Sequence, residues 1–85
     1  MKVYHTDKFV KAYKKAPKQV KSATEAKEEI FRHNPFDPRL KTHKLKGELK
    51  DSYSFSVSYH WRIVFHFEKN DTVILDTIGT HEVYR

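Results

Sequence analysis

The fold is decided by residues 53–84, which read YSFSVSYHWRIVFHFEKNDTVILDTIGTHEVY. In the first seven positions apolar side chains alternate with serines, and residues 61–68 alternate again. Residues 72–78 supply one more short apolar stretch. A period of two is typical of antiparallel strands that are buried on one face only. The alternation places Arg62 and His66 together on the other face, which we expect to form a site.

The N-terminal half predicts one strand and two helices. Residues 2–5 are a strand candidate, and Thr6 can cap the helix that follows. Pro17 separates this helix from a second one, which ends at Asn34-Pro35.

The remaining elements complete an α+β domain. After a loop over residues 34–42, we expect a short ragged strand over residues 45–49 around Gly47, and then three strands with a hairpin turn at Asn70-Asp71. The order is therefore strand, helix, helix, and three or four antiparallel strands. The helical pair must cover one face of the sheet, which gives two layers.

Length and composition limit the chain to one small domain. With 85 residues and a hydrophobic fraction of 38%, its core is near the lower limit for independent stability. The mean hydropathy of −0.82 and the short apolar runs predict neither a membrane-spanning helix nor a signal peptide. The absence of cysteine removes disulfides and thiolate metal sites. We therefore expect a single cytoplasmic domain over residues 1–85.

Positive charge is concentrated in the first 50 residues. They contain 14 Lys and Arg against six Asp and Glu, a net charge of +8, whereas residues 51–85 contain three against five. This asymmetry favours a polyanionic partner such as nucleic acid, or an acidic protein. The alternative is a lysine-rich helix surface that is only solvated.

Most of the six histidines need no function. His5, His33 and His60 fall at the ends of predicted elements, and His66 is expected to be a strand-surface residue. No two histidines have the i,i+4 spacing of a helical zinc motif, and no cysteine assists. We therefore expect no metal and no cofactor.

Another set of side chains could act on a phosphate. His43 opens the segment HKLKG, residues 43–47, while Arg62 begins a central strand and His81 follows the last one. In an antiparallel meander these points converge at one edge of the sheet. The full set is His43, Lys44, Lys46, Arg62, His81 and Tyr84.

Imidazoles and a guanidinium are the groups that metal-free RNA cleavage requires. A base removes the proton from the 2′-hydroxyl, an acid protonates the departing 5′ oxygen, and a fixed cation stabilises the phosphorane. Arginine suits the last role because its planar fork matches phosphate oxygens. From the residues alone, phosphate binding without chemistry explains the set equally well. Arg62 could also serve only the structure, by pairing with Glu68 or Asp76 across the strands.

The motifs also resemble a known superfamily. HKLKG at 43–47, RIVF at 62–65 and IGTHEVY at 78–84, in this strand order, resemble the RelE/ParE superfamily of bacterial and archaeal toxins, nearest to its YoeB and YafQ branches. The resemblance covers nearly the whole chain. It implies a two-layer RelE/ParE-like fold, in which an N-terminal strand and a helical hairpin pack on an antiparallel sheet.

The resemblance implies a toxin of a type II toxin–antitoxin system. Members of the nuclease branches cleave mRNA in the ribosomal A site without a metal, and an antitoxin blocks them. We therefore expect a ribosome-dependent endoribonuclease whose partners are the ribosome, mRNA and an acidic, partly disordered antitoxin. Two alternatives stay open: a ParE-like toxin that inhibits DNA gyrase and is not a nuclease, and a non-catalytic RNA-binding domain.

The family's functional residues are carried over one by one as expectations. Arg62 matches the arginine that contacts the scissile phosphate, and His81 matches a terminal histidine that transfers a proton. His43 stands where the YoeB branch has a catalytic glutamate and the YafQ branch a histidine. Tyr84 resembles the terminal aromatic residue that stacks on or orients a base. Three lysines are expected to contact RNA phosphates: Lys44, Lys46 and Lys50.

Overall fold

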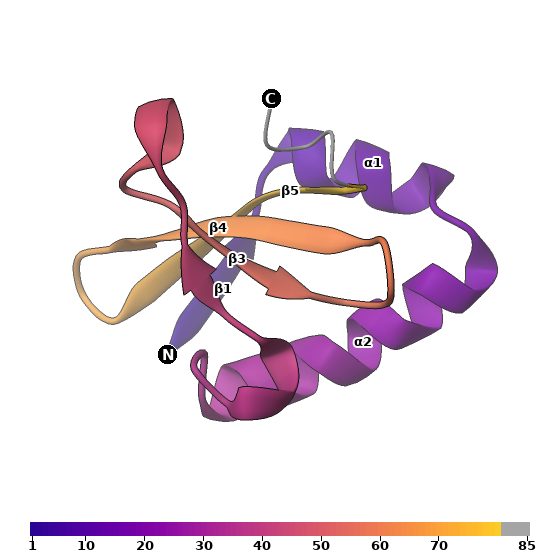
Figure 1. The fold of residues 1–85 in the computed structure, drawn as a ribbon, viewed down its shortest axis with the longest axis horizontal. Coiled ribbons are helices and arrows are strands. Elements are labelled where there is room, and N and C mark those ends of the chain that lie inside the picture. Colours follow the sequence, from indigo (N-terminus) through magenta and orange to yellow (C-terminus); the bar gives the residue numbers. More distant parts are fainter. Residues whose placement is uncertain (81–85) are drawn as a thin grey trace.

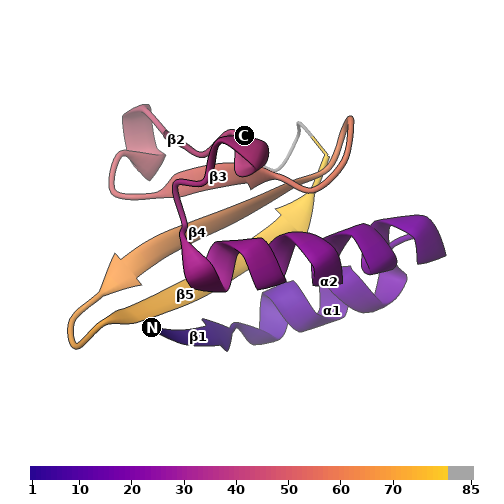
Figure 2. The same ribbon diagram turned by 90° about the horizontal axis from the view of Figure 1, so that it is seen from below.

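The protein consists of a five-stranded sheet with two helices packed on one face (Figure 1). The computed structural model describes residues 1–80. In chain order the elements are β1 (Lys2–His5), α1 (Asp7–Lys15), α2 (Lys18–His33), the 3₁₀ turn η1 (Pro38–Leu40), β2 (His43–Lys44), the 3₁₀ turn η2 (Gly47–Leu49), β3 (Tyr53–Ser56), β4 (Arg62–Glu68) and β5 (Thr72–Gly79). Figure 2 shows both helices on the same side of the sheet. This architecture confirms the predicted two-layer α+β fold.

The sheet has the strand order β1-β5-β4-β3-β2. Neighbouring strands are antiparallel except β1, which pairs parallel with β5 and places Lys2 opposite Thr72. β4 therefore lies at the centre of the sheet with Arg62 as its first residue, as the sequence predicts.

Local signals fix the ends of both helices. The Thr6 side chain accepts a hydrogen bond of 3.0 Å from the backbone N–H of Phe9 and so caps α1. Pro17 follows the end of α1 and precedes α2, because proline lacks the N–H that a continuing helix needs but fits the start of one. α2 ends before Asn34, since the residue before Pro35 avoids the helical conformation.

Aromatic side chains form the centre of the core. Phe31 of α2 is fully buried and lies against Phe55 and Phe65, with ring centroids 4.8 Å apart in each pair. Aliphatic side chains of β4 and β5 surround these rings, among them Ile63 and Leu75. This apolar layer joins the helices to one face of the sheet, so the opposite face carries the polar residues.

Two turns test the sequence-based expectations in detail. Asn70 and Asp71 have φ angles of 63° and 55° in the connection between β4 and β5, so the predicted hairpin turn is confirmed. Asn and Asp tolerate this left-handed conformation better than most residues do. The strand predicted over residues 45–49 is wrong, because the strand is β2 and ends at Lys44. Gly47 begins η2 with a φ of 71°, a conformation that cannot continue an extended strand.

Candidate functional site

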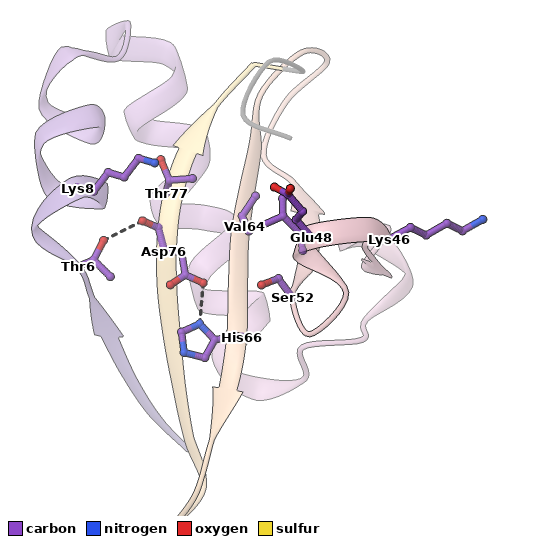
Figure 3. Close-up of a pocket in the computed structure, with 10 residues that line it drawn as sticks. Thr6, Lys8, Lys46, Glu48, Ser52, Val64, His66, Asp76 and Thr77 are labelled. Atoms are coloured by element: carbon purple, nitrogen blue, oxygen red, sulfur yellow. Dashed lines mark hydrogen bonds and ion pairs between the residues drawn. The ribbon is translucent and has the colours of Figure 1, made fainter. Parts of the chain in front are cut away.

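The sheet face away from the helices borders a cavity of about 710 Å³, which we call the large cavity (Figure 3). Its floor consists of side chains from the middle of β4 and β5, including Val64 and His66. One wall is the start of α1 with Lys8, and the other is the η2 segment with Lys46. The predicted alternation along β4 is confirmed, since it gives this open face its polar residues.

His66 lies on the floor of the large cavity between two carboxylates. Its Nδ1 is 2.7 Å from Oδ2 of Asp76, and its Nε2 is 2.9 Å from Oε1 of Glu68. Burial by itself lowers the pKa of His66. The hydrogen bonds to Asp76 and Glu68 and the charges of both carboxylates together raise it by more, so the pKa lies above its ordinary value. In the imidazolium form both ring nitrogens donate, and each carboxylate receives one proton. Both ring nitrogens of His66 therefore have carboxylate partners within residues 1–80, and these partners favour the imidazolium form.

A β-bulge brings Asp76 to His66. Asp76 is an extra residue on β5, between the partners of Val64 and Phe65 on β4. Its backbone carbonyl accepts a hydrogen bond of 2.8 Å from the Thr6 hydroxyl, which ties the bulge to the start of α1 (Figure 3). Because a bulge breaks the period of two, alternation in the sequence does not predict this contact.

Arg62 lies at the first position of β4, opposite Ser56 of β3 and Gly79 of β5. Its Nη1 donates to three backbone carbonyls of the β3–β4 connection, at 3.0, 3.2 and 3.1 Å. Among residues 1–80, its Nε and Nη2 have no hydrogen-bond partner, so three of the five guanidinium N–H donors remain for a ligand. The alternative that Arg62 pairs with Glu68 or Asp76 is wrong, because both carboxylates bind His66.

β2 places His43 opposite Ser54 of β3. Directly opposite residues of antiparallel strands point to the same face, so His43 lies toward the open face. Its Nδ1 is 3.3 Å from the carbonyl oxygen of Lys41. Because a carbonyl can only accept, this contact places the proton of the neutral ring on Nδ1 and the lone pair on Nε2. His43 is thus held in the tautomer that a base acting through Nε2 requires.

The other predicted site residues are dispersed or lie outside the described part of the chain. Lys46 borders the large cavity, whereas Lys44 is exposed on β2 and Lys50 is exposed at the end of η2. His81 and Tyr84 lie outside residues 1–80.

Arg62 does not line the large cavity but borders a smaller one, which the sequence did not predict. Lys27, Arg39 and Lys41 line it together with Arg62. These lysines and Arg39 come from α2 and from the η1 segment, so no periodicity or motif links them to a strand. Only the tertiary packing of η1 beside the β3–β4 connection brings them together.

Two further findings concern the described residues as a whole. Within residues 1–80, no group of three or more histidine or carboxylate side chains is arranged to hold a metal ion. Over the same range, neither helix has the length and apolar character that crossing a membrane demands.

Comparison with known proteins identifies the family. Residues 1–84 match the family model described as "Bacterial toxin of type II toxin-antitoxin system, YafQ". The chain belongs to the YafQ family. The predicted kinship with RelE/ParE-type toxins is therefore confirmed. No curated protein sequence matches this YafQ-family toxin.

Solved structures share the fold of this YafQ-family toxin at low sequence identity. YafQ from E. coli strain BL21(DE3) has a TM-score of 0.79 and 18% identity over 95% of this chain and 93% of that chain. The YoeB/ParE toxin from Agrobacterium tumefaciens has a TM-score of 0.81 and 16% identity over 95% and 99%. A chain of the E. coli DinJ-YafQ toxin-antitoxin complex has a TM-score of 0.76 and 18% identity over 95% and 92%.

Proposed function

We propose that this YafQ-family toxin is a ribosome-dependent endoribonuclease that cleaves mRNA without a metal ion. One observation carries the proposal: Arg62 keeps three guanidinium donors unused among residues 1–80, and its partner Ser56 on β3 is two residues from Ser54, the partner of His43. A cation that matches phosphate oxygens and an imidazole that can transfer a proton are two of the three groups that cleavage at a 2′-hydroxyl needs.

The proposed reaction uses each group once. His43 Nε2 removes the proton from the 2′-hydroxyl, and the 2′ oxygen attacks the adjacent phosphorus. The Nε–Nη2 edge of Arg62 donates to the non-bridging oxygens and stabilises the charge that develops on them. His81 in its protonated form gives a proton to the departing 5′ oxygen. The products are a 2′,3′-cyclic phosphate and a free 5′-hydroxyl.

The path of the chain supports the role of His81. Gly79 pairs with Arg62 at the end of β5. His81 follows Gly79 by two positions in the sequence. We also propose that Tyr84 orients a base, and that the exposed Lys44, Lys46 and Lys50 contact phosphates.

The toxin's partners follow from its family and its charge. The E. coli relative forms the DinJ-YafQ toxin-antitoxin complex, and we propose that an acidic antitoxin likewise binds this toxin. The net charge of +8 on residues 1–50 supports electrostatic docking to the RNA of the ribosome.

Primer extension on ribosome-bound message tests the proposal. Arg62→Ala and His81→Ala should each reduce cleavage by about 10²–10⁴-fold, the usual effect of removing one such group. The cleavage rate of Arg62→Lys should lie between those of wild type and Arg62→Ala, because lysine keeps the positive charge but lacks the planar fork of the guanidinium. His33→Ala is the control, since this exposed side chain contacts only Glu29 among residues 1–80. Circular dichroism of each variant checks that the fold persists.

Three outcomes would contradict the proposal. Wild-type cleavage by both alanine variants would remove the assigned site. No cleavage by the wild-type toxin would favour the ParE-like alternative, which a DNA gyrase supercoiling assay detects directly. RNA binding without either activity would leave a non-catalytic RNA-binding domain.

A further inference from the structure

The smaller cavity beside Arg62 has a volume of about 270 Å³, and we call it the basic cavity. It lies where α2, η1 and the β3–β4 connection meet. Its cationic lining residues are Lys27, Arg39, Lys41 and Arg62. None of the carboxylates within residues 1–80 lines it, whereas Glu48 and Asp76 both line the large cavity.

Backbone carbonyls hold two of these cations in place. The Nζ of Lys27 donates to the carbonyl of Arg39 at 3.2 Å. Nη1 of Arg62 is held by the β3–β4 connection in the same way. Side chains that are already ordered lose less conformational entropy when they bind a ligand. The basic cavity is therefore preorganised for an anion.

The charge of the basic cavity is not compensated. Arg39 forms a bidentate pair with Asp37, with Nε–Oδ1 at 3.0 Å and Nη2–Oδ2 at 2.9 Å. Hydrogen bonds from the side chain and the backbone of Arg39 lower the pKa of Asp37 to about 2, so this pair is neutral overall at physiological pH. Within residues 1–80, no ion pair includes the three remaining cations, Lys27, Lys41 and Arg62.

The other lining groups suit a nucleotide. Ser56 and Ser58 add hydroxyl donors beside the cations. Tyr59 borders the same cavity with 84% of its surface exposed, which leaves its ring available to stack on a base. Three uncompensated cations with hydroxyl donors form a site for a phosphate group, and an adjacent exposed ring favours single-stranded nucleic acid.

We propose that the basic cavity binds a backbone phosphate of the single-stranded RNA substrate, with Lys27 and Lys41 as its ligands and Tyr59 against a neighbouring base. This inference rests on the proposed function, since it assigns the substrate's path past Arg62. The lysines are binding residues and take no part in proton transfer.

The decisive variant is Lys27→Gln combined with Lys41→Asn. Glutamine keeps a donor for the Arg39 carbonyl, and asparagine tolerates the left-handed backbone at Lys41, where φ is 53°. The matched control is Lys2→Gln combined with Lys69→Gln, which removes the same two charges near the opposite end of the sheet.

The first measurement is the affinity for a fluorescent, fully 2′-O-methylated RNA oligonucleotide, which binds but cannot be cleaved. At about 0.1 M salt the decisive variant should bind the oligonucleotide at least about fivefold more weakly than wild type. Its log affinity should also depend less steeply on log salt, because each phosphate contact on a single strand contributes a slope of about −0.7. The control should bind within about twofold of wild type. Single phosphates of the oligonucleotide can be replaced by uncharged methylphosphonates. Replacement at one position should weaken RNA binding by the wild-type toxin, and the same replacement should not weaken RNA binding by the decisive variant.

The outcomes separate this inference from the proposed function. Equal affinity and equal salt slope for wild type and the decisive variant would overturn the inference, whatever the cleavage assay gives. Unchanged RNA binding with weaker binding of the acidic antitoxin would assign the basic cavity to the protein partner and also overturn it. A toxin that binds the oligonucleotide through the basic cavity but cleaves no mRNA would overturn the proposed function alone.

Discussion

The large cavity and the basic cavity both contain basic side chains, but they differ in whether carboxylates bind them. In the large cavity, carboxylates bind both ring nitrogens of His66, so the fold itself supplies the partners of its imidazolium form. In the basic cavity, Lys27, Lys41 and Arg62 have no carboxylate partner among the described residues. The difference indicates that the carboxylates beside His66 stabilise its charged form within the fold, whereas the cations of the basic cavity repel one another until an anion binds.

The largest expected effect separates two histidines. His43→Gln should lower mRNA cleavage by about 10²–10⁴-fold, because it removes a proton-transfer group. His66→Gln should leave cleavage within about threefold, as is usual for a residue outside the reacting centre. Primer extension on translating ribosomes measures both variants. An equal loss in the two variants would show that the compensated histidine also takes part in the reaction.

A second prediction extends the comparison to the uncompensated charge of the helices. Changing the exposed Lys11, Lys14 and Lys18 to Glu should weaken ribosome binding by about 10²-fold at 0.1 M salt, at about fivefold for each lost phosphate contact. None of these lysines lines either the large or the basic cavity, so cleavage should recover at high ribosome concentration. Sedimentation with ribosomes across a salt series measures the affinity. An affinity independent of salt would show that these lysines are only solvated.

We expect the acidic antitoxin to bind the surface whose lysines and arginines have no carboxylate partners. A partner that binds only the folded toxin stabilises it by about 2.7 kcal/mol at a concentration 100 times the Kd. For a domain of this size that raises Tm by about 10–20 °C. Thermal melts with and without the protein encoded by the neighbouring gene test this. No shift in Tm, together with no co-purification, would leave the toxin without this partner.

The smallest effect concerns the stability that His66 provides. Its raised pKa means that the folded state binds the proton more tightly, so the stabilisation is complete below the unfolded pKa and is lost as pH rises through the folded pKa. His66→Gln should therefore destabilise the fold by about 1–3 kcal/mol near pH 6, the usual worth of hydrogen bonds to charged groups, and by less near pH 9. Urea unfolding at both values measures this difference. His33→Gln is the control, and a pH-independent loss would mean that His66 acts through packing.

The sequence predicted those parts of the molecule that depend on local periodicity. Alternation placed Arg62 and His66 on the open face, and Asn70-Asp71 marked the hairpin turn correctly. It did not predict the contact between His66 and Asp76, because one bulge shifts the side chains of β5. Lys27 could not be predicted to line the same cavity as Arg62, because only the tertiary fold brings α2 to the β3–β4 connection.

The position of β5 between β1 and β4 has a consequence for the synthesis of the toxin. β5 joins β1 to β4, and its Thr72 pairs with Lys2, 70 positions earlier in the chain. β5 is also the last of the described strands to be translated, so neither pairing can form while it is still inside the ribosome. Contacts between such distant segments form slowly. Arg62 gains its partner Gly79 only once β5 has been synthesised, so the pairing at the start of β4 forms later than the pairing of β4 with β3 can.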